Sequence, residues 1–316
     1  MSAPATRAAR VEAVPAGVAS CMPAAAAWIA LLKLRIASMV VLSAFVGALL
    51  AGGSGGGLGG GLAAALEAAL WVGCVAAASS IFNQVLERDT DALMARTAMR
   101  PLVTGALRTR DAILLGALLG AAGVGALALR FNTLSALLAL ATLAAYALVY
   151  TPLKRHSSLN TVVGAVPGAM PPLLGSVAVS GHVGGFGLYL FATLFVWQFP
   201  HFMAIAWTYR RDYARAGLRM LPALEGSEGM AGRQAALYAL VLLPVSLLPA
   251  VRHEAGLLYA AAALVLGLAY LGASLAFAWR ETPARARALL ITSLVYLPVL
   301  FSAMLVDPVV RVLSSI

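Results

Sequence analysis

The stretch "LAAALEAALWVGCVAAASSIFNQVLERDTD", residues 62–91, is apolar over its first two thirds and polar over its last third. An α-helix rises about 1.5 Å per residue, so about twenty apolar residues cross the hydrocarbon core of a bilayer. The apolar run over 62–82 has this length. The stretch therefore predicts a transmembrane helix that ends in charged residues at one membrane surface.

The rest of the chain repeats this pattern. Of its 316 residues, 62% are hydrophobic and 11% are charged, whereas about a quarter of the residues of a soluble domain are charged. We predict an all-α integral membrane protein, a bundle of about nine transmembrane helices. The expected spans are 36–52, 62–82, 111–129, 133–150, 159–179, 187–208, 233–251, 255–279 and 288–308. We assign 33–316 to a single transmembrane domain and expect 1–32 to be a disordered cytoplasmic tail.

The positive charges favour one orientation of this bundle. Lysine and arginine accumulate in cytoplasmic loops. With the N-terminus in the cytoplasm, all but three of the 22 Lys and Arg residues lie on the cytoplasmic side, the exceptions being Arg130, Arg252 and Arg311. This bias explains the net charge of +10, and we find no nucleic-acid motif and expect no nucleic-acid partner. The two cysteines have no disulfide or zinc-site spacing.

Three polar residues follow one another at four-residue intervals at the end of the second span. Asn83, Glu87 and Asp91 share one face if the helix continues past the membrane edge. Amide and carboxylate oxygens suit Mg²⁺, which usually binds one or two carboxylates together with substrate phosphates. Arg96 and Arg100 follow, and guanidinium groups bind phosphate oxygens by charge-assisted hydrogen bonds. The alternative is a solvated charged loop, but such a loop does not require the regular four-residue spacing.

Two further polar groups are expected near the same membrane surface. Tyr150, Lys154 and Arg155 follow the fourth span, and the two cations are either topology anchors or phosphate ligands. Gln198 and His201 lie within the sixth span. Ionisable groups inside a membrane are costly, which favours a functional role for His201, although a hydrogen-bonded histidine in the bundle core is the alternative.

The segment after the sixth span carries one carboxylate among several arginines. Asp212 stands between Arg211 and Arg215 and is either a metal ligand or part of an ion pair. Asp89 lies off the four-residue stripe of the second span and has no assigned role. Because spans two, four and six run in the same direction, the three polar groups meet at one membrane face above apolar walls. Such a site suits a substrate with a phosphorylated head and a hydrocarbon tail.

Three segments carry a resemblance to a known family: "NQVLERDTDALMARTAMRPLVTG" (83–105), "YTPLKRHSSLNTVVGAVPGAMPPLLG" (150–175) and "LFVWQFPHFMAIAW" (194–207). In order and spacing they resemble the protoheme IX farnesyltransferases, a branch of the UbiA superfamily of membrane prenyltransferases. The resemblance implies that the farnesyl group of farnesyl diphosphate is transferred to a vinyl group of protoheme IX. Water is added and heme O is formed, as a precursor of heme A. It also implies Mg²⁺ as cofactor and a downstream heme A synthase as a partner.

The resemblance implies a role for each matching residue. The implied metal ligands are Asn83, Glu87, Asp91 and Asp212. The implied diphosphate ligands are Asn83, Arg96, Arg100, Lys154 and Arg155, and the catalytic residues are Asp91, Tyr150 and Lys154. The expected heme contacts are Gln198, His201 and Arg211. Ala216 stands where many superfamily members have a second acid after Asp212, which argues against a symmetric clamp of two metal ions.

Two other functions remain open at this point. A UbiA-type prenyltransferase acting on a quinone precursor is disfavoured by the "PHF" block, 200–202, and by the lone Asp212. A heme transporter without chemistry would leave the acidic stripe beside the arginines unused. We expect a bacterial plasma (inner) membrane protein with cytoplasmic active-site loops. A mitochondrial inner-membrane location fits less well, since the N-terminal segment is short.

Overall fold

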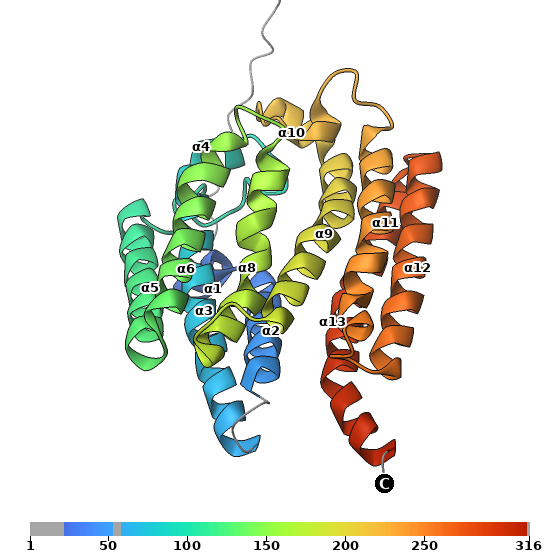
Figure 1. Cartoon of the computed structure of the whole chain (residues 1–316). Helices are drawn as coiled ribbons and strands as arrows, with labels where there is room; N and C mark the ends of the chain where they lie inside the picture. Colours follow the sequence, from blue (N-terminus) through green and yellow to red (C-terminus); the bar gives the residue numbers. More distant parts are fainter. Residues whose placement is uncertain (1–21, 53–57, 315–316) are drawn as a thin grey trace, which may run out of the picture.

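The computed structural model describes residues 22–52 and 58–314, and every regular element among them is helical (Figure 1). The elements are α1 (Ala24–Leu32), α2 (Leu34–Gly52), α3 (Leu58–Leu86), α4 (Arg88–Asp91), α5 (Thr109–Arg130), α6 (Thr133–Ala144), the π-helix η1 (Ala145–Tyr150), α7 (Thr151–Leu153), α8 (Asn160–Ser180), α9 (Gly185–Thr208), α10 (Arg210–Arg215), the 3-10 helix η2 (Leu221–Ala223), α11 (Met230–Val251), α12 (Leu257–Trp279) and α13 (Pro283–Ser314). Within the described residues, nine helical segments are long and apolar enough to cross a membrane. The expected span count is confirmed.

The spans form two groups, and the central helices α8 and α9 join them. In one group α2 packs against α3, α3 against α5, and α5 against α6. In the other group α9, α11, α12 and α13 pack in sequence. The groups meet where α8 packs against α9, at the centre of Figure 1. The short helices α4 and α10 lie at the same end of the bundle (Figure 1), so the charged segments after the second and sixth spans reach one face.

Glycines allow the backbones of α2 and α8 to touch. A Cβ atom on Gly175 would lie 1.9 Å from the carbonyl oxygen of Ala44, and one on Gly47 would lie 2.0 Å from that of Pro172. No side chain fits at either position. Close packing of small residues replaces the hydrophobic driving force that helices lack in lipid. The glycines therefore fix α8, which is the most buried span, against α2.

Replacing Gly175 with Ala should destabilise the bundle, because the new methyl group must push α2 and α8 apart. We expect a cost of about 1–3 kcal/mol, which is typical of an overpacked core, and a lower midpoint of thermal unfolding in detergent. Gly125→Ala in α5 is the matched control, since its Cβ atom would meet nothing within 4 Å. Equal midpoints for the two variants would contradict the proposed close contact.

The segment before the first span is partly folded. Residues 1–21 of the expected tail lie outside the described residues. The expectation of disorder does not hold for α1, in which Ala27 and Leu31 are fully buried. The side-chain amide of Gln84 on α3 donates to the carbonyl oxygen of Leu31 over 2.7 Å. The apolar face of α1 is therefore held on α3, next to the start of the first span.

Candidate active site

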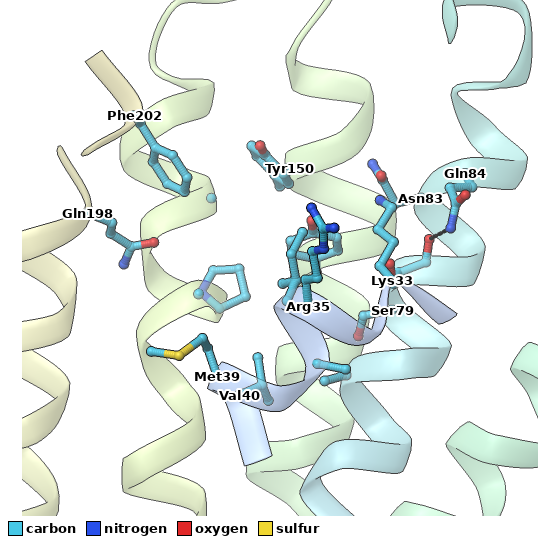
Figure 2. Close-up of a pocket in the computed structure, with 18 of the residues that line it drawn as sticks. Lys33, Arg35, Met39, Val40, Ser79, Asn83, Gln84, Tyr150, Gln198 and Phe202 are labelled. Carbon is cyan, nitrogen blue, oxygen red and sulfur yellow. Dashed lines mark hydrogen bonds between the residues drawn. The ribbon is translucent and has the colours of Figure 1, made fainter. Parts of the chain in front are cut away.

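A cavity of about 900 Å³ lies inside the bundle. At the end near α4 it is lined by the charged and polar residues Lys33, Asn83, Glu87, Asp91, Arg96, Arg100, Tyr150 and Lys154. Deeper in the bundle its walls are apolar and include Val40, Val75, Leu174, Leu194, Leu297 and Phe301. Figure 2 shows Gln198 and Phe202 of α9 on one side of this cavity, with Asn83 of α3 and Tyr150 on the other. One continuous space thus joins a charged mouth to an apolar interior.

The expected stripe of Asn83, Glu87 and Asp91 is present. Although α3 ends at Leu86 and α4 begins at Arg88, the helical hydrogen bonding continues across the junction. The Glu87 amide donates to Asn83 O over 2.9 Å and the Asp91 amide to Glu87 O over 2.7 Å. All three side chains are buried and line the cavity, whereas Asp89 is exposed and lies outside it.

Each of the two stripe carboxylates is paired with a cation. Lys154 Nζ lies 2.7 Å from Glu87 Oε1, and the Arg100 guanidinium donates to Asp91 Oδ2. Lys154 Nζ also lies 4.5 Å from the centroid of the Tyr150 ring. Together with Asn83 and Arg96, seven of the expected diphosphate, metal and catalytic residues therefore lie around one end of the cavity.

The second carboxylate oxygen of Asp91 is open to a cation. Asp91 Oδ1 is buried and has no hydrogen-bond partner, and such a group is costly to leave uncompensated. Burial raises the pKa of the Asp91 carboxyl above its ordinary value, while Arg100 acts in the opposite direction. In the described residues no group of three or more His, Cys, Asp or Glu could hold a metal. Two carboxylates and one amide match the sparse protein ligation typical of Mg²⁺ on a phosphorylated substrate.

The orientation of the Asn83 amide follows from its neighbours. The Thr151 hydroxyl donates to the carbonyl oxygen of Tyr146 over 2.9 Å. Its only proton is thereby used, so its oxygen accepts from the nitrogen of Asn83, 3.1 Å away. The nitrogen of the Asn83 amide is committed to Thr151, and the amide oxygen remains for a ligand in the cavity.

The segment that carries Tyr150 is a π-helix, which the sequence did not reveal. The Thr151 amide bonds to Tyr146 O, one residue further back than in an α-helix. Pro152 gives the local reason, because it has no N–H and its ring displaces the carbonyl group four residues earlier. Gly164 of α8 makes room for the Tyr150 ring, since a Cβ atom there would lie 2.4 Å from it. Single π-turns of this kind are frequent at functional sites.

Three expected site residues do not line the cavity. Arg155 and Arg211 are exposed, and Asp212 forms an ion pair with Arg215. Tyr213, the next residue, is the one that lines the cavity. Successive residues of a helix point about 100° apart, so the rotation of α10 that buries Tyr213 turns Asp212 away. Asp212, Arg211 and Arg155 therefore lie outside the cavity lining, and their expected roles in metal, heme and diphosphate binding stay predictions.

Lys33 is a cavity residue that the sequence reasoning counted only as a topology anchor. It lies in the break between α1 and α2 with φ 50° and ψ 52°, a left-handed conformation that is rare for residues other than glycine. Figure 2 shows Lys33 near Asn83 and Gln84 of α3. Burial and the neighbouring charges of Arg100 and Lys154 lower the pKa of the Lys33 ammonium to about 7. Strained backbone at a half-buried cation that lines the cavity indicates a functional position. In the sequence, such a cation cannot be told from a topology anchor beside a span.

Gln198 and His201 both line the cavity on its α9 side. The amide nitrogen of Gln198 donates to the carbonyl oxygen of Ala165 over 2.8 Å and so joins α9 to α8. His201 Nδ1 lies 2.8 Å from the hydroxyl of Ser293 on α13. Of the three expected heme contacts, the structure therefore places two at the cavity.

Comparisons with known proteins agree with this geometry. Residues 40–301 match the model of the UbiA prenyltransferase family. A protoheme IX farnesyltransferase from Koribacter versatilis is 42% identical over 88% of this chain and 91% of the relative. One from Solibacter usitatus is 46% identical over 74% of this chain and 80% of the relative.

Solved structures show the same fold. A UbiA homolog from Aeropyrum pernix superimposes with a TM-score of 0.69 at 23% identity, covering 87% of this chain and 98% of the other. A UbiA homolog from Archaeoglobus fulgidus bound to GPP and Mg²⁺ gives a TM-score of 0.59 at 17% identity, covering 88% and 99%. With most of its length matched in family, relatives and fold, the chain belongs to the UbiA prenyltransferase family and is an integral membrane prenyltransferase.

Proposed function

We propose that this enzyme transfers the farnesyl group of farnesyl diphosphate to a vinyl group of protoheme IX, with addition of water. The products are heme O and diphosphate. The observation that carries the proposal is one continuous cavity, in which paired carboxylates and cations at one end give way to apolar walls at the other. The relatives of 42% and 46% identity named above are protoheme IX farnesyltransferases, which supports this choice of donor and acceptor.

The diphosphate of the donor belongs at the charged end. Asn83, Glu87 and Asp91 would hold Mg²⁺ there, and the unpaired Oδ1 atom of Asp91 supports this assignment. When bound, Mg²⁺ neutralises the negative charge that develops on the diphosphate leaving group. The protein supplies two carboxylates and one amide, and substrate oxygens complete the ligand set.

Lys154 and Arg100 have a second use once the donor is present. Each is paired with a stripe carboxylate, and each can turn to the oxygens of the diphosphate when those carboxylates bind a metal ion. Charge-assisted hydrogen bonds to the leaving group are strongest when its C–O bond has broken, so they lower the barrier. Arg96 lines the same end, with its guanidinium 3.4 Å from the Tyr213 hydroxyl.

The allylic cation that remains after the C–O bond breaks must react with the vinyl group before it reacts with water. The apolar walls keep water away from it. Tyr146, Tyr150, Trp197 and Phe202 line the cavity, and aromatic faces stabilise a cation. The vinyl carbon then forms the new C–C bond, and a water oxygen adds to the resulting cation and loses a proton. Phe199 of the same helix as Trp197 and Phe202 is buried outside the cavity and stacks on Tyr238.

We also infer a bacterial plasma membrane location with the charged mouth facing the cytoplasm. The support is the positive charge bias of the loops, which places all but three of the 22 Lys and Arg residues on one side. A heme A synthase would then be the downstream partner that consumes the product.

An acceptor comparison tests the proposal. Membranes that contain the protein are incubated with Mg²⁺, labelled farnesyl diphosphate, and either protoheme IX or a hydroxybenzoate quinone precursor. We expect label only in the heme fraction. Label on the quinone precursor would support the other prenyltransferase function, and no transfer to either acceptor by the folded protein would support a role without chemistry.

Replacing Thr151 with Val should weaken metal use, because the Asn83 amide loses the partner that orients it. Loss of a residue that hydrogen-bonds to a metal ligand typically lowers the metal affinity about 10–100-fold. We therefore expect the Mg²⁺ concentration for half-maximal farnesyl diphosphate binding to rise about tenfold. Thr151→Ser keeps the hydroxyl and should behave as the wild type. If Thr151→Val binds the donor with an unchanged Mg²⁺ dependence, the assigned orientation of Asn83 is wrong.

A further inference from the structure

The imidazole of His201 is held in a fixed state by Ser293. The Ser293 hydroxyl oxygen lies 2.6 Å from the carbonyl oxygen of Leu290 and 2.8 Å from His201 Nδ1. Two oxygens this close need a proton between them, and a carbonyl has none to give. The Ser293 proton is therefore used on Leu290, and the Ser293 oxygen can only accept from His201.

It follows that Nδ1 of His201 carries a proton. In a neutral imidazole the other nitrogen, Nε2, then has a free lone pair. Nε2 has no hydrogen-bond partner within the described part of the chain, and His201 lines the cavity. An imidazolium would instead carry a second N–H without a partner beside the Phe202 ring, whose centroid lies 5.7 Å from that of the imidazole, and an unpaired N–H is costly.

The plane of the ring is fixed as well. The Trp197 indole stacks on His201 with the ring centroids 4.9 Å apart and an interplanar angle of 22°. Trp197 Nε1 donates to the carbonyl oxygen of Ser293 over 3.0 Å, and the Tyr270 hydroxyl donates to the carbonyl oxygen of Trp197 over 2.9 Å. These contacts tie α9, α12 and α13 together around one histidine. Packing alone would not require a cavity-lining imidazole whose Nε2 has no hydrogen-bond partner.

A neutral imidazole whose Nδ1–H is bonded to an oxygen, with Nε2 open, is the arrangement that proteins use for metal ligands. Mg²⁺ prefers oxygen ligands, and its proposed ligands lie on α3, on α4 and at the junction between them rather than on α9. The acceptor of the proposed reaction carries an iron ion, for which imidazole is a common axial ligand. Mg²⁺ and the porphyrin iron would therefore bind in different parts of the cavity.

We propose that His201 ligates the iron of the acceptor porphyrin through Nε2, and that Ser293 is the positioning residue that fixes this tautomer. The inference rests on the proposed function, because it takes an iron porphyrin as the substrate. A bond at the centre of the porphyrin fixes its depth in the cavity and leaves the vinyl groups at its edge free to meet the prenyl chain.

The test uses the full-length protein purified in detergent, with ferric protoheme IX and metal-free protoporphyrin IX as probes. Absorption and electron paramagnetic resonance spectra report the iron ligand, and titrations report both affinities. For the wild type we expect a histidine-ligated spectrum. His201→Ala should lose this spectrum and regain it with added imidazole. Ser293→Ala should bind ferric protoheme about tenfold more weakly and should bind the metal-free porphyrin as the wild type does.

Two controls separate ligation from folding. Ser293→Thr keeps the hydroxyl and should keep the wild-type spectrum, and Thr292→Ala changes a neighbouring hydroxyl that bonds within its own helix. Imidazole rescue of His201→Ala decides the case even if Ser293→Ala aggregates. If His201→Ala keeps the wild-type spectrum and still prefers ferric protoheme to the metal-free porphyrin, the proposed ligation is wrong. The proposed function would stand in that case if the protein still transferred farnesyl. Failure of the folded wild type to bind either porphyrin would overturn the proposed function as well.

Discussion

Asp91→Asn should reduce the rate of farnesyl transfer by about 10³-fold, the upper range for loss of one preorganised charge-stabilising group. The amide has nearly the shape of the carboxylate but lacks its charge. It would leave Arg100 without its ion-pair partner and offer Mg²⁺ at most an uncharged amide oxygen in place of the carboxylate. Because both losses act on the developing charge of the leaving group, the effect should appear in kcat rather than in acceptor binding. The measurement is the initial rate of heme O formation by the purified protein.

Asp89→Asn is the matched control for this variant. It removes the same charge two residues away, from an exposed side chain outside the cavity. Its activity should stay within about twofold of the wild type, as surface changes usually do. A similar loss in both variants would mean that the net charge of the segment matters, and not the stripe of Asn83, Glu87 and Asp91.

Lys154→Met should lower kcat by about 10²-fold, while Arg155→Met should change it by less than about twofold. The two cations are adjacent in sequence, but only Lys154 lines the cavity and contacts Glu87. Methionine keeps much of the side-chain volume and removes the positive charge that we assign to the diphosphate. Initial rates at saturating farnesyl diphosphate measure the difference.

Loss of Lys154 also leaves Glu87 buried without its cation, which is destabilising by itself. Thermal unfolding of the variant therefore has to be measured beside its rate. Lys154→Arg restores the positive charge and should recover part of the activity. A folded Lys154→Met protein with wild-type kcat would refute the role in leaving-group stabilisation.

Much of the fold was predictable because each span is an apolar run bounded by charges. The stripe of Asn83, Glu87 and Asp91 was predictable for a similar reason, since a four-residue spacing keeps one face as long as the helix continues. It does continue across the break at Glu87, where the backbone hydrogen bonds keep the helical pattern.

Positions in short connecting segments were not predictable in the same way. A rotation of α10 by one residue would place the side chain of Asp212 where that of Tyr213 lies. A helix of six residues has no periodic pattern to set its rotation. Lys154 and Arg155 are adjacent cations that follow α7, and the turn of the chain there decides which of them faces the cavity. The left-handed backbone at Lys33 is not marked by a glycine in the sequence. The position of Lys33 in the cavity lining was therefore visible only in the structure.

The central claim is that the charged stripe and the apolar cavity together farnesylate protoheme IX. Its most direct test is mass spectrometry of the porphyrin after incubation of the purified protein in lipid nanodiscs with Mg²⁺, farnesyl diphosphate and protoheme IX. We expect the mass of heme O with the wild-type and Asp89→Asn proteins, and unchanged protoheme with Asp91→Asn. Unchanged protoheme with a folded, heme-binding wild-type protein would contradict the claim.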